Sequence, residues 1–197
     1  MVSGTNGREQ TMRLSGIAEN QGNVSFSYKK FYAIRKLINK TFAEKFYYDM
    51  QMDMVANILK FGDTQPAVVV STNPLLVAAY SDEMDAVVML QFPAELAAQY
   101  NLTTGSRLTT SNVYYNTGKC ADDIFPGAGF SCNYSDFTPV VQLFIGKKDE
   151  KIKEKVGLFD EALWEQVGCK ADEYIMAHPG LRRDGFYYFK KKRSVKA

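Results

Sequence analysis

The sequence contains few of the residues that most often carry catalysis or bind metals. It has three cysteines and one histidine among 197 residues. Three cysteines at irregular spacing do not make a disulfide framework, so free thiols in a reducing compartment are expected. Because His178 is the only histidine, any thiol–imidazole pair or histidine-containing metal site must use it.

Long hydrophobic runs are also absent. No run approaches the roughly 18 apolar residues of a membrane span, and residues 1–16 have no apolar core of a secretory signal. We therefore expect a soluble, cytoplasmic protein with no membrane partner. A charge excess is missing too: 24 Lys and Arg oppose 22 Asp and Glu, a net charge of +2. Such a balance indicates no class of partner by itself.

Hydrophobic residues, by contrast, are plentiful, at 46% of the chain with 13% aromatic. This composition predicts a well-filled core, and the length suits one domain. The first 22 residues are polar and lack any apolar period, which predicts a mobile arm over 1–22. A single domain is then expected over 23–191, followed by a basic tail over 192–197.

Helical patterns flank a β-rich centre. Thr41 and Glu44 match a capping box, and a helix over 41–61 would direct an apolar stripe to the core, made of Tyr47, Met50, Met54, Ile58 and Phe61. Asp160 is a predicted N-cap in a helical region over 148–177, with breaks expected at Gly157 and Gly168.

Three valine-rich apolar runs lie between residues 66 and 93, separated by turn residues. Continuous rather than alternating runs indicate strands covered on both faces, here paired antiparallel. Further strands are predicted at 107–115, 139–145 and 185–191. The fold class is therefore α+β, a mostly antiparallel sheet of about five to six strands with helices packed on it.

A long segment without periodicity runs from residue 116 to 138. Loops of this length in compact domains are usually functional or disordered, and its aromatic residues favour an ordered loop. Its glycines can supply backbone donors and its aspartates acceptors beside an apolar pocket. The candidate ligand-binding residues are Asp122, Asp123, Phe125, Gly127, Gly129 and Phe130. The alternative is a packed surface loop without a site.

Catalysis and metal binding have weaker support. Cys120 as nucleophile, His178 as base and Asp122 as orienting group form the candidate catalytic set. Cys120, Cys132, Cys169 and His178 match the ligand count of a zinc site, but no pair has zinc-knuckle spacing. No metal and no cofactor are therefore expected.

Nucleic-acid binding is the second functional hypothesis. Residues 181–197 carry seven basic residues against one aspartate, interleaved with four aromatics. Phosphate neutralisation and base stacking require such residues; the candidates are Arg182, Arg183, Tyr187, Lys190 and Lys192. The alternative is a core strand followed by solvated lysines, with the aromatics pointing inward.

The leading hypothesis is a non-catalytic binding domain that uses the 116–138 loop. Its partner would be a small molecule or a protein whose identity the sequence does not give. A nucleic-acid-associated protein is the alternative, and an enzyme dependent on cysteine and histidine ranks third.

Overall fold

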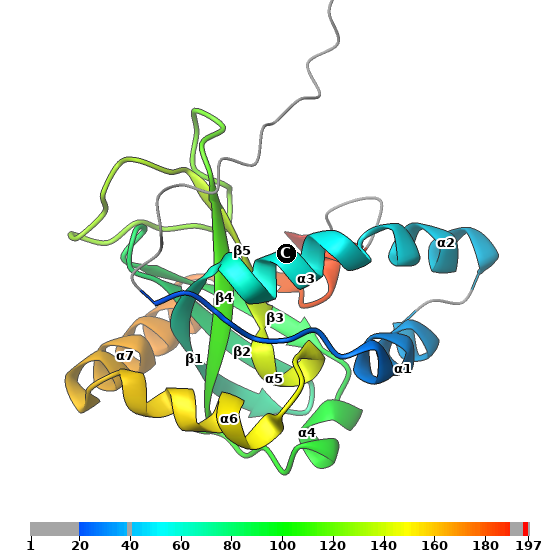
Figure 1. Ribbon diagram of the computed structural model, residues 1–197. Coiled ribbons are helices and arrows are strands. Elements are labelled where there is room, and N and C mark those ends of the chain that lie inside the picture. The colour runs from blue at the N-terminus through cyan, green and yellow to red at the C-terminus, as the bar shows by residue number, and fades with distance from the viewer. Residues whose placement is uncertain (1–19, 39–40, 190–194, 197) are drawn as a thin grey trace, which may run out of the picture.

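A seven-stranded sheet organises the protein, in the order β5-β4-β1-β2-β3-β6-β7. The computed structural model describes residues 20–38, 41–189 and 195–196 (Figure 1). All neighbouring strands are antiparallel except β3 and β6, which are parallel. The strands are β1 Asp63–Thr72, β2 Leu75–Ser81, β3 Ala86–Phe92, β4 Arg107–Tyr115, β5 Asp136–Val141, β6 Arg182–Asp184 and β7 Val195–Lys196. The predicted α+β class with a mostly antiparallel sheet is confirmed.

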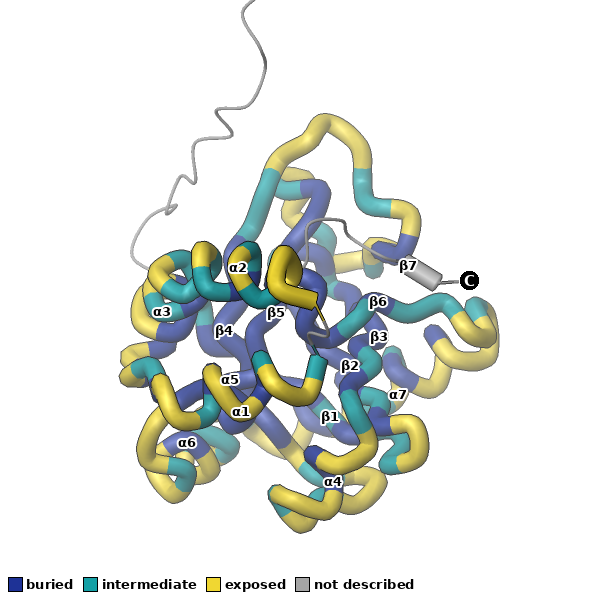
Figure 2. The backbone as a smooth tube through the Cα atoms, turned by 90° about the vertical axis from the view of Figure 1, so that its right-hand side faces the viewer, coloured by how far each residue is buried: buried dark blue, intermediate teal, exposed yellow. Residues whose placement is uncertain are grey.

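Helices cover both faces of this sheet. They are α1 Tyr28–Ile38, α2 Phe42–Met50, α3 Met52–Phe61, α4 Glu95–Gln99, α5 Gln142–Ile145, α6 Asp149–Glu154 and α7 Glu161–Ala177. Figure 2 shows the strands largely buried and the outer sides of the helices exposed. Within the described residues, no helix has the length and apolar content needed to cross a bilayer.

The side chains of β2 explain why its sequence is apolar without interruption. Successive residues of a strand point to opposite faces. Val77 and Ala79 belong to the large core, which also includes buried residues of α1, α3 and α5. Ala78 and Tyr80 belong to a second core with α7. Both faces therefore select apolar residues, as the valine-rich runs predicted.

The predicted helix over 41–61 is correct in its start and wrong in its continuity. The Thr41 hydroxyl accepts the Glu44 amide and the Glu44 carboxylate accepts the Thr41 amide, which confirms the capping box. The helix is interrupted at Gln51, which separates α2 from α3. The predicted stripe is therefore not continuous: Met50 is 63% exposed and Phe61 is 38% exposed. Of the predicted stripe, Ile58 is buried as expected, and Tyr47 and Met54 are half-buried. The other buried side chains of the two helices are Tyr48, Val55 and Leu59.

The C-terminal prediction also needs correction. Residues 187–189 form a short 3-10 helix rather than a strand, and all four aromatics from Phe186 to Phe189 are buried. A tight turn can direct consecutive side chains into one core, whereas a strand alternates them between faces. The predicted basic tail includes β7, which pairs antiparallel with β6. Its other residues lie outside the described part of the chain, as do residues 1–19 of the predicted arm.

Two other boundaries differ from prediction. The strand expected at 139–145 begins at Asp136 and ends at Val141, and α5 follows it directly. The helix α7 continues through Gly168, while Asp160 caps its start by accepting the Leu163 amide at 2.8 Å. The three central strands and β4 lie where the sequence predicted them.

Candidate functional site

A buried ion cluster fixes the 116–138 loop to the sheet. The Arg183 side chain, on β6, is fully buried. Its Nη2 lies 2.7 Å from Asp123 Oδ1 and 3.1 Å from Asp136 Oδ1, its Nε also donates to Asp123, and its Nη1 donates to the Phe137 carbonyl at 2.7 Å. Burial disfavours the guanidinium charge, but the hydrogen bonds that Arg183 donates to Asp123 and the neighbouring charges hold the pKa of Arg183 above its ordinary value. Asp123 is therefore an anchor of the loop.

A second anchor is Asp85, in the turn between β2 and β3. Its φ of 45° lies in the left-handed region, which aspartate tolerates better than most residues. Its carboxylate accepts the Gly129 amide at 3.0 Å, Gln166 Nε2 at 3.0 Å and Lys170 Nζ at 2.9 Å. Burial raises the pKa of Asp85, but the Gly129 amide and then Lys170 outweigh it and hold the pKa below its ordinary value. One carboxylate thus joins the loop, the turn and α7.

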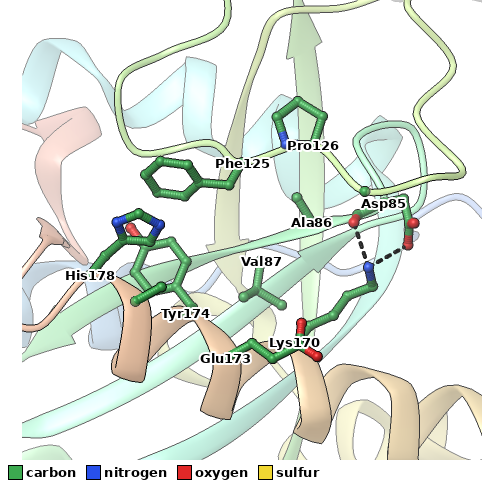
Figure 3. A pocket seen from close by; sticks show the side chains of 11 residues that line it. Asp85, Ala86, Val87, Phe125, Pro126, Lys170, Glu173, Tyr174 and His178 are labelled. Atoms are coloured by element: carbon green, nitrogen blue, oxygen red, sulfur yellow. Dashed lines mark hydrogen bonds and ion pairs between the residues drawn. The ribbon is translucent and has the colours of Figure 1, made fainter.

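A cleft of about 260 Å³ lies beside the Asp85 anchor (Figure 3). Ala86 and Val87 of β3 form its back, with Phe125 on one side and Lys170 of α7 on the other. The remaining lining residues are Asp85, Pro126, Gly127, Glu173, Tyr174, Ala177 and His178. The cleft is therefore made by the loop, the sheet and α7 together.

Aromatic rings close one end of the cleft. The Phe125 ring stacks on the His178 imidazole with centroids 3.5 Å apart and planes 6° from parallel. The Tyr174 ring meets Phe125 edge-on at 5.8 Å. Burial, and then the Asp123 carboxylate, raise the pKa of Tyr174, so its phenol is neutral at physiological pH. Three rings from two segments thus form a wall beside the cleft.

Replacing Gly127 with alanine is expected to loosen the loop. A Cβ at this position would overlap both the carboxylate and the carbonyl of Asp85. Relieving that overlap displaces an anchor of the loop, and we expect a loss of about 1–3 kcal/mol in unfolding free energy. Chemical denaturation measures the loss, with Gly129→Ala as control because its Cβ would lie 3.4 Å from Asp85 Cβ, an ordinary contact. Equal stability of the two variants would contradict this packing.

The predicted ligand-binding residues fall into separate groups. Phe125 and Gly127 line the cleft, and Gly129 supports it through its amide. Asp123 is buried in the ion cluster, and Asp122 is exposed, with its carboxylate 3.3 Å from Lys119 Nζ. Phe130 is half-buried against the large core.

Sequence reasoning missed four polar residues of this cleft: Asp85, Lys170, Glu173 and Tyr174. The last three lie on adjacent turns of α7, at the helical spacing of three to four residues that places side chains on one face. That spacing is the sequence pattern that could have identified these three residues as neighbours on one face of α7. Asp85 lies in a turn, where no such periodic pattern exists.

The candidate catalytic residues do not form a reactive pair. Cys120 is half-buried, and Cys132 and Cys169 are exposed, all as free thiols. His178 stacks on a phenyl ring, and no hydrogen bond joins it to a thiol in the described part of the chain. Among the residues that the structure describes, no three His, Cys, Asp or Glu side chains gather as a metal site would require.

The nucleic-acid candidates are also dispersed. Arg183 is buried in the ion cluster, and Tyr187 is buried with its hydroxyl 2.7 Å from Thr138 Oγ1. Neither side chain is at the surface for contact with a phosphate or a base. Arg182 is half-buried, while Lys190 and Lys192 lie outside the described residues.

Asp63, the first residue of β1, makes a pH-dependent contribution to stability. Burial raises the pKa of Asp63 to about 6; Gln65 and Tyr114 lower it through hydrogen bonds, and Asp82 and Glu83 raise it through their charges. An unfolded aspartate titrates near 3.9. The raised pKa means that the folded state favours the protonated form. The contribution of the protonated Asp63 to the free energy of unfolding is therefore fully present below about pH 4 and is lost as the pH rises through about 6.

The variant Asp63→Asn is therefore expected to stabilise the protein at neutral pH. Asparagine keeps an oxygen that can accept from Gln65 and Tyr114 and carries no charge to bury. We expect a gain of about 2 kcal/mol at pH 7.5 and almost none at pH 4. Urea denaturation across this range measures the difference between variant and wild type. A difference that stays constant with pH would exclude Asp63 as its source.

Comparison with known proteins gives no further assignment for this cleft. No protein family, no curated protein and no solved structure among those compared matches the chain.

Proposed function

We propose that this protein is a non-catalytic binding domain that takes a small organic cation into the cleft beside the 116–138 loop. The proposal rests on one observation: the cleft combines a wall of aromatic rings with a carboxylate that has no ion pair among the described residues. Phe125, Tyr174 and His178 supply the rings, and Glu173 supplies the charge. Aromatic faces and carboxylates are the groups that attract ammonium ligands.

The charges of the lining residues support a cationic ligand. Lys170 and Asp85 neutralise each other, since their charged atoms lie 2.9 Å apart. Glu173 is exposed, and no ion pair to it occurs among the described residues. The lining therefore carries one uncompensated negative charge, on α7. A ligand ammonium can pair with Glu173 while its apolar part contacts Val87 and Phe125.

The size of the cleft favours a small ligand. Its volume of about 260 Å³ lies just below the roughly 300–1,000 Å³ of pockets for drug-sized molecules. A single aromatic ring with a short aminoalkyl chain matches that size. A lysine or arginine side chain from a protein partner has the same charge and similar bulk, so the cleft also suits one exposed residue of a peptide.

A binding role has more support than catalysis. None of the cysteines lines the cleft. The His178 imidazole is engaged with Phe125 and has no hydrogen-bonded nucleophile in the described part of the chain. A general base must lie within hydrogen-bond reach of the group it activates, and the cleft offers no such pair around His178.

Calorimetric titration with phenethylammonium tests the proposal, with 3-phenylpropanoate as the anion of matched shape. We expect the cation to bind and the anion to bind at least about tenfold more weakly, because the lining carries negative charge. Glu173→Gln should weaken cation binding by roughly fivefold, about 1 kcal/mol. Asp172→Asn is the control, because Asp172 is exposed on α7 but does not line the cleft.

Two results would contradict the proposal. One is equal affinity for the cation and the anion, which would remove the role of charge. The other is an equal effect of the Glu173 and Asp172 substitutions, which would place the bound cation elsewhere on the helix surface.

A further inference from the structure

A second and larger groove lies where α1, α4 and the start of α6 meet. Its volume is about 630 Å³, within the usual range of ligand pockets. Figure 1 places the three helices around one corner of the molecule, away from the loop. No residue of this groove lines the cleft described above. The two cavities are therefore separate sites.

The floor of the groove is apolar. Ile34 of α1, Leu96 of α4 and Phe144 of α5 are buried beneath it. The Tyr100 ring packs on Phe144 with centroids 5.4 Å apart, and Leu37 remains 42% exposed along one wall. Such a floor can accept an alkyl chain or a ring system, and burying that chain would remove apolar surface from water.

The rim of the groove carries an excess of positive charge. Five lysines line it against two carboxylates. Lys30 is already neutralised, because its Nζ lies 2.7 Å from Asp149 and also donates to the Leu143 carbonyl at 2.6 Å. The remaining carboxylate is Glu95, on the α4 side. The uncompensated ammonium groups belong to Lys29, Lys147, Lys148 and Lys153.

Among the described residues these four lysines have few ion-pair partners, so their ammonium groups are available to a ligand. All four residues are exposed. The only ion pair that involves one of them in the described residues joins Lys153 to Glu150 at 3.4 Å between two exposed side chains, and pairs of that kind contribute little. Ion pairs within the described part of the protein therefore leave most of the positive charge of the rim unneutralised.

The backbone at Lys148 points to the same conclusion. Lys148 has φ 61° and ψ 69°, a left-handed conformation that glycine adopts at lower cost than lysine. The backbone conformation therefore gives no reason for a lysine at this position. A lysine there places an ammonium at the start of α6, beside the groove, and a binding role accounts for that residue where backbone conformation does not.

We propose that this groove binds an amphipathic anion, a molecule with an apolar chain or ring system and one carboxylate or phosphate head. The apolar part lies on Ile34, Leu96 and Phe144, and the head lies among Lys147, Lys148 and Lys29. The ligand could be a free carboxylic acid or a phosphate monoester, since both present the same combination of chain and charge. This site is independent of the proposed cation cleft.

Calorimetric titration of the full chain tests this site with three amphiphiles of equal chain length, each below its micelle concentration. Dodecanoate and dodecyl phosphate represent the two anionic heads, and dodecyltrimethylammonium is the cationic control. We expect at least one anion to bind at least about tenfold more tightly than the cation. Raising the salt concentration should weaken the anion, because the rim charges are exposed. Comparison of the two anions identifies the preferred head.

Charge reversal locates the site. The double variant Lys147→Glu/Lys148→Glu should weaken anion binding by about tenfold or more. Lys151→Glu is the matched control, since Lys151 is exposed on α6 outside the groove lining, and its affinity should stay within about twofold of wild type. The variant Lys148→Gly separates the effect on binding from the effect on folding. Its melting temperature should not fall, because glycine favours the left-handed backbone. Its affinity for the anionic amphiphiles should fall.

Three outcomes would overturn the proposal. The cationic amphiphile could bind as tightly as both anions, which would leave an apolar site without charge selection. The control at Lys151 could weaken binding as much as the double variant. An acidic peptide without apolar residues could bind as tightly as the anions, which would make the apolar floor irrelevant.

Discussion

Replacing Arg183 with methionine is expected to lower the free energy of unfolding by about 3–5 kcal/mol. Arg183 is fully buried and pairs with two carboxylates, Asp123 at 1% and Asp136 at 12% side-chain exposure. Methionine fills much of the same space but leaves both carboxylates without the guanidinium. Removing one partner of a buried ion pair is costly because the remaining charge stays desolvated.

Urea denaturation of Arg183→Met measures this loss. Arg182→Met is the neighbouring control, since Arg182 is half-buried on the same strand and forms no ion pair in the described part of the chain. We expect the control to lose less than about 1 kcal/mol. Adding Asp123→Asn to Arg183→Met should recover part of the loss by removing one unpaired charge. Equal losses for the two arginine variants would show that the ion cluster does not hold the loop.

The variant Ile58→Ala is expected to cost about 2–5 kcal/mol of unfolding free energy. Ile58 lies on α3, is 1% exposed and belongs to the large core. Truncation removes buried methyl and methylene groups and leaves a cavity that the surrounding strands cannot fully close. The effect is large because the lost transfer free energy and the cavity cost add.

Met50→Ala is the control for this prediction. Met50 was expected on the same stripe from its spacing, but it is 63% exposed, so its truncation should change stability by less than about 0.5 kcal/mol. Melting temperatures and urea midpoints of both variants give the comparison. A loss for Met50→Ala as large as that for Ile58→Ala would show that Met50 is buried in the core, as the predicted stripe requires.

Local chemistry accounts for the parts of the fold that the sequence predicted. The Thr41 capping box needs only four consecutive residues. The strands around Val77 are apolar on both sides because two cores meet them. The interruption at Gln51 was not predicted, because the apolar spacing continues across it and only packing selects Tyr48 rather than Met50. The buried turn of Phe186 to Phe189 likewise depends on the core that receives it.

The site was predicted only in part. The length and aromatic content of the 116–138 loop indicated an ordered segment, and Phe125 and Gly127 lie at the cleft. The roles of its aspartates depend on distant partners, because Asp123 meets Arg183 sixty residues further along the chain. No local pattern at Asp123 distinguishes a buried anchor from a ligand-binding carboxylate, and the same holds for Asp85 beside α7.

Backbone amide chemical shifts during titration with phenethylammonium test the proposed binding role most directly. We expect saturable shifts concentrated at residues 85–87, 125–129 and 170–178, the three segments that line or support the cleft. Glu173→Gln should reduce the apparent affinity without moving the affected residues elsewhere. The absence of saturable shifts in these segments, or shifts confined to other parts of the chain, would contradict a cation site beside the loop.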